Sequence, residues 1–127
     1  MEKYNYTWSE FDEDIDKIVE WTKLFEFDNI YGIPRGGLVV AVALSHKIEI
    51  PVILDSKDIT NKTLVVDDIV DSGKTVSKLF EGDKIAMVAS LFYDKNTIYI
   101  PQFVPNLKEE WVVFPWETNE SSKYDNN

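Results

Sequence analysis

The chain has 127 residues and a formal net charge of −10, with 13 Lys and Arg against 23 Asp and Glu. This acidic balance argues against a nucleic-acid partner, because a phosphate backbone needs a concentrated basic surface. The chain contains no cysteine, which excludes disulfides and thiolate metal sites. No apolar stretch is long enough for a membrane span, and the residues after Met1 lack the apolar region of a signal peptide. We therefore expect a cytoplasmic protein with no membrane partner.

The N-terminal part of the chain predicts a helix, a strand and a second helix. Ser9 is the expected N-cap of the first helix, and apolar residues at helical spacing extend it to about Leu24. A short apolar strand is expected at 29–33, directly before Pro34-Arg35-Gly36-Gly37. The nearly all-apolar run 38–45 then predicts a helix that is buried on most sides.

The rest of the chain predicts mainly strands. They are expected at 51–55, 63–66, 85–93, 97–100 and 111–114. A polar loop at 67–75 and a short helix at 76–80 follow the second of these strands, which is apolar on both faces as in a covered parallel sheet. This alternation predicts an α/β fold with a doubly wound, mainly parallel sheet and a small C-terminal hood. We expect one domain over residues 1–117 and a frayed polar tail at 118–127.

The most informative stretch begins at the strand Leu64-Val65-Val66 and continues to Thr75. Two adjacent carboxylates, Asp67 and Asp68, follow the strand, and Asp71-Ser72-Gly73-Lys74-Thr75 leads into a helix. Ligands of open α/β sheets bind at this end of the strands. Amides and hydroxyls at a helix start suit a phosphate, whereas carboxylates suit ribose hydroxyls or Mg²⁺. A Walker A loop is excluded, because Asp68 stands where that motif needs its first glycine.

This stretch closely resembles the motif by which type I phosphoribosyltransferases bind 5-phosphoribosyl 1-pyrophosphate (PRPP). The family pattern is two acidic residues, a variable pair, a third Asp and a Thr/Ser-Gly-x-Thr loop, and every part is present here. The resemblance implies that Asp67 and Asp68 orient the ribose, with Asp68 as the contact to Mg²⁺. It implies Asp71 as general base toward the purine. It also implies a 5′-phosphate site made by Ser72, Gly73, Lys74 and Thr75.

A second segment, Gly32-Ile33-Pro34-Arg35-Gly36-Gly37-Leu38, resembles the first loop of that family. In the family this loop binds the pyrophosphate of PRPP through backbone amides and often contains a cis peptide before its basic residue. The resemblance implies that Arg35, Gly36 and Gly37 bind pyrophosphate, that Arg35 stabilises its charge during the reaction, and that the Pro34–Arg35 peptide is cis.

A third segment, from Trp111 to Glu117, resembles the Trp-x-x-x-Pro-Trp-acid ending of the xanthine-guanine and hypoxanthine branch. The resemblance implies that Trp111 stacks on the purine, that Val112 offers main-chain contacts, and that Trp116 packs. Lys95 matches the lysine of that branch that hydrogen-bonds the purine 6-oxo group, or else it is a surface lysine closing a turn. The single histidine, His46, is expected near a helix C-terminus with no catalytic role.

The resemblance as a whole implies transfer of the phosphoribosyl group of PRPP to a 6-oxopurine (xanthine, guanine or hypoxanthine), with Mg²⁺ as cofactor. It also implies a homo-oligomer, a dimer or tetramer. One departure matters: only Ser56 to Lys62 stands where the family usually has a long loop that closes over the site. Seven residues suit a tight connection better than a lid. The alternatives are therefore an enzyme, with a lid that a partner subunit supplies if one is needed, a PRPP- or nucleotide-binding regulatory module without catalysis, or a structural relic.

Overall fold

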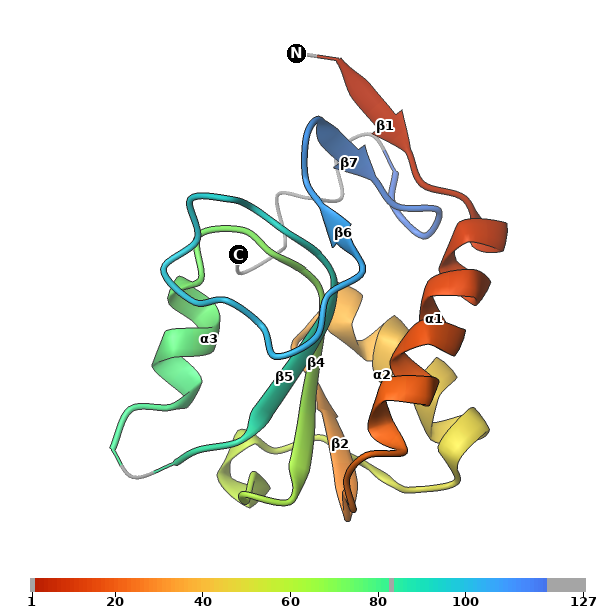
Figure 1. The fold of residues 1–127 in the computed structure, drawn as a ribbon. Coiled ribbons are helices and arrows are strands. Elements are labelled where there is room, and N and C mark those ends of the chain that lie inside the picture. The colour runs from red at the N-terminus through yellow and green to blue at the C-terminus, as the bar shows by residue number, and fades with distance from the viewer. Residues whose placement is uncertain (1, 83, 119–127) are drawn as a thin grey trace.

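The computed structural model describes residues 2–82 and 84–118, so the expected tail at 118–127 lies outside the described residues apart from Thr118. Its main sheet has five strands, all parallel, in the order β3-β2-β4-β5-β6 (Figure 1). These strands are β2 (Asn29–Gly32), β3 (Val52–Ile53), β4 (Thr63–Val70), β5 (Met87–Tyr93) and β6 (Asn106–Leu107). A second sheet pairs β1 (Lys3–Asn5) with β7 (Trp111–Val113), also in parallel, and forms the hood.

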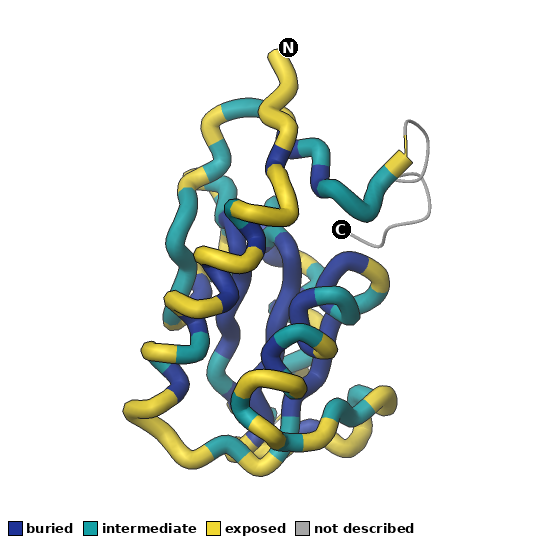
Figure 2. Tube along the Cα trace, turned by 90° about the vertical axis from the view of Figure 1, so that its right-hand side faces the viewer, coloured by how far each residue is buried: buried dark blue, intermediate teal, exposed yellow. Residues whose placement is uncertain are grey.

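Helices cover both faces of the main sheet, as expected for a doubly wound fold. Helices α1 (Trp8–Thr22) and α2 (Gly36–Ile48) lie on one face, and α3 (Lys74–Leu79) lies on the other (Figure 1). Side chains of β4 alternate between two cores: Leu64 packs in the cluster that contains α1 and α2, and Val65 in the cluster that contains Val76 of α3. Buried residues concentrate in the central strands and on the inward sides of the helices (Figure 2). The predicted α/β class is confirmed.

The first helix starts earlier than the sequence pattern indicated. Its N-cap is Thr7, whose hydroxyl accepts a hydrogen bond from the Glu10 amide while the Glu10 carboxylate accepts one from the Thr7 amide. This capping box satisfies two backbone donors at once, an advantage that Ser9 with Asp12 does not offer here. The prediction of Ser9 as N-cap was therefore wrong, and the helix ends at Thr22.

The strand that carries the acidic pair is longer than predicted. β4 continues to Val70 because its pairing with β5 continues through Asp67↔Ser90 to Val70↔Tyr93. Both aspartates of the pair therefore belong to a strand, and the loop before α3 is short. The predicted strand at 97–100 is wrong: the Thr97 hydroxyl hydrogen-bonds the Tyr99 backbone and holds these residues in a loop.

The hood depends on a pairing that the sequence did not indicate. The predicted strand near Trp111 exists as β7, and its partner is β1 at the opposite end of the chain, with Lys3 opposite Trp111 and Tyr4 opposite Val112. Strand β6 extends the main sheet beside β5 and was not predicted. His46 lies exposed in the last turn of α2, as expected. Among the described residues, no helix combines the length and apolar character needed to cross a membrane.

Candidate functional site

The candidate site lies at the carboxyl ends of β2 and β4, where the two following connections leave the sheet toward opposite faces. β2 and β4 are parallel neighbours; the chain leaves β2 toward α2 on one face and leaves β4 toward α3 on the other. In open α/β sheets such a switch point leaves a crevice at the carboxyl ends of the strands, where ligands bind. The structure thus brings the two loops identified in the sequence to one edge of the sheet.

The first loop joins β2 to α2 through a cis Pro34–Arg35 peptide, as the resemblance implied. The Gly37 amide donates to the Ile33 carbonyl at 2.9 Å and closes the first turn of a 13-residue helix. No hydrogen bond from the Gly36 amide to a described residue accompanies it, and Gly36 itself is buried. The start of a helix of this length favours negative charge.

The first loop contacts the carboxyl end of β4 through Gly36 and Asp68. A Cβ atom at Gly36 would lie 1.8 Å from Oδ2 of Asp68, so only glycine allows this carboxylate to sit against the first loop. Asp68 is 5% exposed, and its Oδ1 accepts a hydrogen bond from the Ile69 amide at 2.8 Å. Asp67 is equally confined, with its Oδ1 accepting from the Asp68 amide at 2.8 Å. Both carboxylates are held in place before any ligand arrives.

The loop between β4 and α3 is held from the side by the residues after β5. The Ile98 amide donates to the Ser72 carbonyl at 2.9 Å, and the Ser72 hydroxyl accepts from the Lys74 amide at 3.2 Å. Gly73 has φ 84°, and a Cβ there would lie 2.5 Å from Oγ1 of Thr97. A pocket of about 550 Å³ opens beside this loop and is lined by Asp71, Ser72, Lys74, Asp94 and Asn96.

A lysine that the sequence did not single out connects this loop to the hood. Nζ of Lys108 lies 3.1 Å from Oδ1 of Asp71 and 3.8 Å from Oδ2 of Asp94. The same ammonium stands 5.3 Å from the ring centroid of Trp111, a cation–π distance. Lys95 lies exposed in the turn after β5 and forms no ion pair or hydrogen bond with a described residue. The sequence around Lys108 gives no sign of this role, because its partners Asp71 and Asp94 come from two other parts of the chain.

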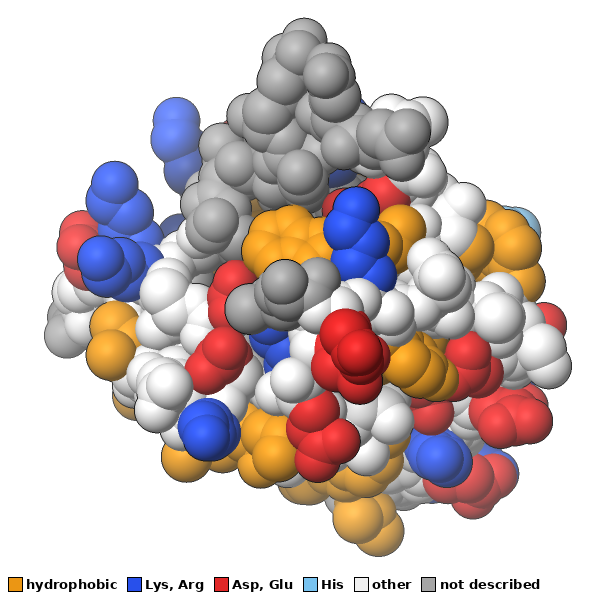
Figure 3. All heavy atoms as spheres, turned by 90° about the horizontal axis from the view of Figure 1, so that it is seen from above, with side chains coloured by type: hydrophobic (Ala, Val, Ile, Leu, Met, Phe, Trp, Pro, Cys, Tyr) orange, Lys and Arg blue, Asp and Glu red, His pale blue; other side chains and the backbone are white. Residues whose placement is uncertain are grey.

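Trp111 and Trp116 have different environments. Trp111 is 44% exposed, whereas Val112 beside it is 7% exposed. Trp116 stacks on Phe114 with ring centroids 5.0 Å apart and meets Phe11 edge-on. Seen from above the strand ends, hydrophobic, basic and acidic side chains lie next to one another (Figure 3). An exposed indole beside an ammonium and carboxylates suits a flat, polar-edged ligand.

The carboxylates at the switch point fit a magnesium ion that is shared with a substrate. Among residues 2–82 and 84–118, no three His, Cys, Asp or Glu side chains gather into a metal-binding group. Magnesium commonly takes one or two carboxylates and completes its shell with water and phosphate oxygens. Asp68, fixed against the first loop, has a carboxylate of the kind that such an ion would accept as a ligand.

The connection from β3 to β4 is held in place by burial and by a hydrogen bond. It contains the 3₁₀ turn η1 (Ser56–Asp58), and its Ile59 is 5% exposed. The Lys84 ammonium donates to the Ser56 carbonyl at 2.8 Å. The segment is a tight connection, as its length predicted, and it does not reach over the site as a lid.

Comparison with known proteins gives a consistent set of relatives. A purine phosphoribosyltransferase of Pyrococcus horikoshii Ot3 is 33% identical, with a TM-score of 0.83 over 93% of this chain and 96% of that one. A xanthine-guanine phosphoribosyltransferase of Idiomarina loihiensis is 28% identical over 72% of both chains. A protein of the same name from Desulfotalea psychrophila is 25% identical over 91% of this chain and 86% of its own. No family model matches the chain.

Proposed function

The chain belongs to the type I phosphoribosyltransferase family, which consists of pentosyltransferases, and on that premise we propose that it transfers the phosphoribosyl group of PRPP to a purine. The observation that carries the proposal is the contact between Gly36 and Asp68, which joins the first loop to the acidic strand end. Through this contact the pyrophosphate and ribose sites become one continuous site at the switch point.

Each part of PRPP has a counterpart in the crevice. The pyrophosphate lies on the first loop, held by the Arg35 guanidinium and the Gly36 amide, while the Gly37 amide, which donates to the Ile33 carbonyl, maintains the turn. The ribose hydroxyls donate to Asp67 and Asp68. The 5′-phosphate is held by the loop Ser72, Gly73, Lys74 and Thr75, whose conformation the residues after β5 maintain.

The reaction breaks the bond between the anomeric carbon and the pyrophosphate oxygen and forms a bond from that carbon to a purine nitrogen. Negative charge grows on the departing pyrophosphate, where Arg35 and the loop amides stabilise it. A Mg²⁺ ion held by Asp68 supplies further charge neutralisation when bound. The proton that the purine loses passes to the carboxylate of Asp71.

The purine lies on Trp111 and beside the backbone of Val112, and Lys108 selects its substituent. An ammonium only donates hydrogen bonds, so it favours a 6-oxo group, an acceptor, over a 6-amino group. Lys108 lies next to both Trp111 and Asp71, and Lys95 does not contact either. We therefore assign the 6-oxo contact to Lys108 in place of Lys95, and propose xanthine, guanine or hypoxanthine as the base.

One observation favours a second candidate, a regulatory module that binds PRPP or a nucleotide without transferring it. The tied-down connection after β3 leaves the crevice without a lid from that segment. Closure normally excludes water from an oxocarbenium-like transition state and completes a site. The intact set of Arg35, Asp67, Asp68 and Asp71 favours the enzyme.

The deciding experiment follows nucleotide formation from PRPP and Mg²⁺ with hypoxanthine, guanine, xanthine or adenine. We expect turnover with at least one 6-oxopurine and little with adenine. Asp71→Asn should remove the activity, whereas Asp28→Asn, a matched change at an exposed carboxylate, should not. If no base reacts but PRPP still raises the melting temperature, the chain is the binding module. If neither signal appears, the site assignment is wrong.

A further inference from the structure

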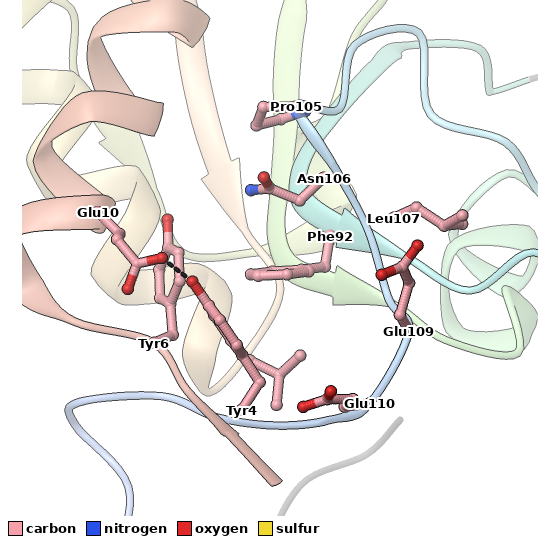
Figure 4. A pocket seen from close by; sticks show the side chains of 10 residues that line it. Tyr4, Tyr6, Glu10, Phe92, Pro105, Asn106, Leu107, Glu109 and Glu110 are labelled. Carbon is pink, nitrogen blue, oxygen red and sulfur yellow. Dashed lines mark hydrogen bonds between the residues drawn. The ribbon is translucent and has the colours of Figure 1, made fainter. Parts of the chain in front are cut away.

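A separate pocket lies between the hood and α1. It measures about 470 Å³ and opens between β1 and the segment that joins β6 to β7, with Phe92 of β5 beside it (Figure 4). Of the residues assigned to PRPP or the purine, only Val112 lines it. Lys108, although it lies between two lining residues, directs its ammonium to Asp71 in the crevice. The pocket is therefore a second hollow that borders the proposed substrate site at Val112.

Aromatic and aliphatic side chains form much of this pocket. Tyr4 and Phe92 have ring centroids 6.4 Å apart, inclined at 60°, and Leu107 lies on the other side (Figure 4). Leu107 is 40% exposed and Tyr4 is 38% exposed, so solvent reaches these surfaces in the absence of a ligand. Aromatic faces attract organic cations as well as apolar groups.

The polar groups of the pocket have their donor hydrogens already engaged. The Tyr4 hydroxyl donates to the Glu10 carboxylate. The Asn106 amide donates to Asp14 at 2.7 Å and to the Leu91 carbonyl at 3.0 Å, which leaves its Oδ1 as an acceptor. What these side chains still offer a ligand is therefore oxygen lone pairs.

Two carboxylates complete this acceptor set. Glu109 and Glu110 line the pocket and form no hydrogen bond or ion pair with a described residue. No Lys, Arg or His is among the lining residues. A hydrated metal ion would gain nothing from the aromatic walls, whereas an organic cation with a carbon chain matches both features.

We propose that this pocket binds a small organic cation, an aliphatic amine or guanidine. Its charged end meets Glu109 and Glu110, and its carbon chain lies against Tyr4 and Phe92. The pairing is set by charge complementarity and by donor–acceptor count: the ligand brings donors only, and the pocket offers acceptors. This binding does not depend on the transferase activity.

Isothermal titration with putrescine tests the proposal, with butanediol as the neutral analogue of equal length. The variant Glu109→Gln/Glu110→Gln is compared with Glu26→Gln/Glu81→Gln, which removes the same charge at exposed positions outside the pocket. We expect saturable binding of putrescine by the unaltered chain and by the control variant. The pocket variant should bind about tenfold more weakly or worse, since a hydrogen bond to a charged group contributes about 1.5–3 kcal/mol.

Any one of four results would overturn the proposal. Equal weakening in both double variants, or equal binding of butanediol, would mean that bulk charge or apolar contact alone attracts the ligand. Absence of saturable binding by the unaltered chain would mean that the pocket takes no such cation. Amide chemical shifts locate the ligand independently: changes should be largest at Tyr4 and at 107–112, and changes centred elsewhere would contradict the assignment.

Discussion

The two halves of the proposed substrate site are built in different ways. The PRPP half is made by the loops after β2 and β4, whose positions depend on glycines and on hydrogen bonds between residues near in sequence, such as that from the Ile69 amide to the Asp68 carboxylate. The purine half is made in the hood, where β7 pairs with β1 from the other end of the chain and Lys108 meets Asp71, 37 residues away. Local motifs therefore specify the residues proposed to contact the phosphates, and long-range packing brings together those proposed to contact the base.

Asp71 belongs to both halves, so its replacement should have the largest effect. Asp71→Asn removes the proposed base and the carboxylate partner of Lys108. We expect a loss of about 100- to 10,000-fold in kcat/KM, the usual contribution of a positioned general base. Steady-state kinetics beside Asp28→Asn provide the check. Activity within a fewfold of the unaltered enzyme would exclude Asp71 as the base.

The next largest loss of activity is expected when the tightest contact of the PRPP half is filled. In Gly36→Ala the new Cβ would lie 1.8 Å from the Asp68 carboxylate, so the loop or the carboxylate must move. A displacement of about 1 Å in a site can cost about 100-fold in rate. Gly82→Ala is the control: φ there is 81°, but nothing lies within 4 Å of the new Cβ. If Gly36→Ala bound PRPP with unchanged affinity, the contact would be incidental to binding.

Replacement of Lys108 should weaken purine binding, whereas replacement of Lys95 should not. Lys108→Met keeps an apolar stem beside Trp111 and removes the ammonium. We expect the KM for a 6-oxopurine to rise about 10- to 100-fold with the KM for PRPP little changed, since a hydrogen bond to a charged group contributes about 1.5–3 kcal/mol. Lys95→Met, at an exposed position, should leave both values unchanged. If Lys95→Met raised the KM for the 6-oxopurine and Lys108→Met did not, the 6-oxo contact would return to Lys95, as the sequence resemblance implied.

The smallest predicted effect is a loss of stability at the junction between the hood strand β1 and α1. Thr7→Ala removes the capping box and should lower the free energy of unfolding by about 1 kcal/mol. Ser9→Ala, at the residue expected to be the cap, should be nearly neutral because Ser9 lies exposed inside the helix. Urea unfolding of both variants measures the difference. Equal destabilisation would mean that the helix has no single dominant cap.

Features that depend on local sequence could be predicted, whereas features that depend on long-range contacts could not. The strands β2, β4 and β5 could be placed from apolar runs, and the loops after β2 and β4 from glycines and adjacent carboxylates. The extent of β4 could not, because Asp67 to Val70 join the strand only through pairing with β5. The residues near Thr97 look like a strand by composition, yet their side-chain hydrogen bonds to backbone hold a loop that supports Gly73.

The sequence by itself determined the fold class, and it predicted the edge of the sheet that carries the proposed site and the residues of its PRPP half. Those features depend on residue type and on neighbours along the chain: glycine where two backbones touch, carboxylates at a strand end, hydroxyls at a helix start. Only the tertiary structure decided that β1 completes the hood, that Lys108 is the cation beside Trp111, and that a second pocket exists behind it. These contacts join residues far apart in the chain, and no local pattern of side chains encodes which distant partner each one meets.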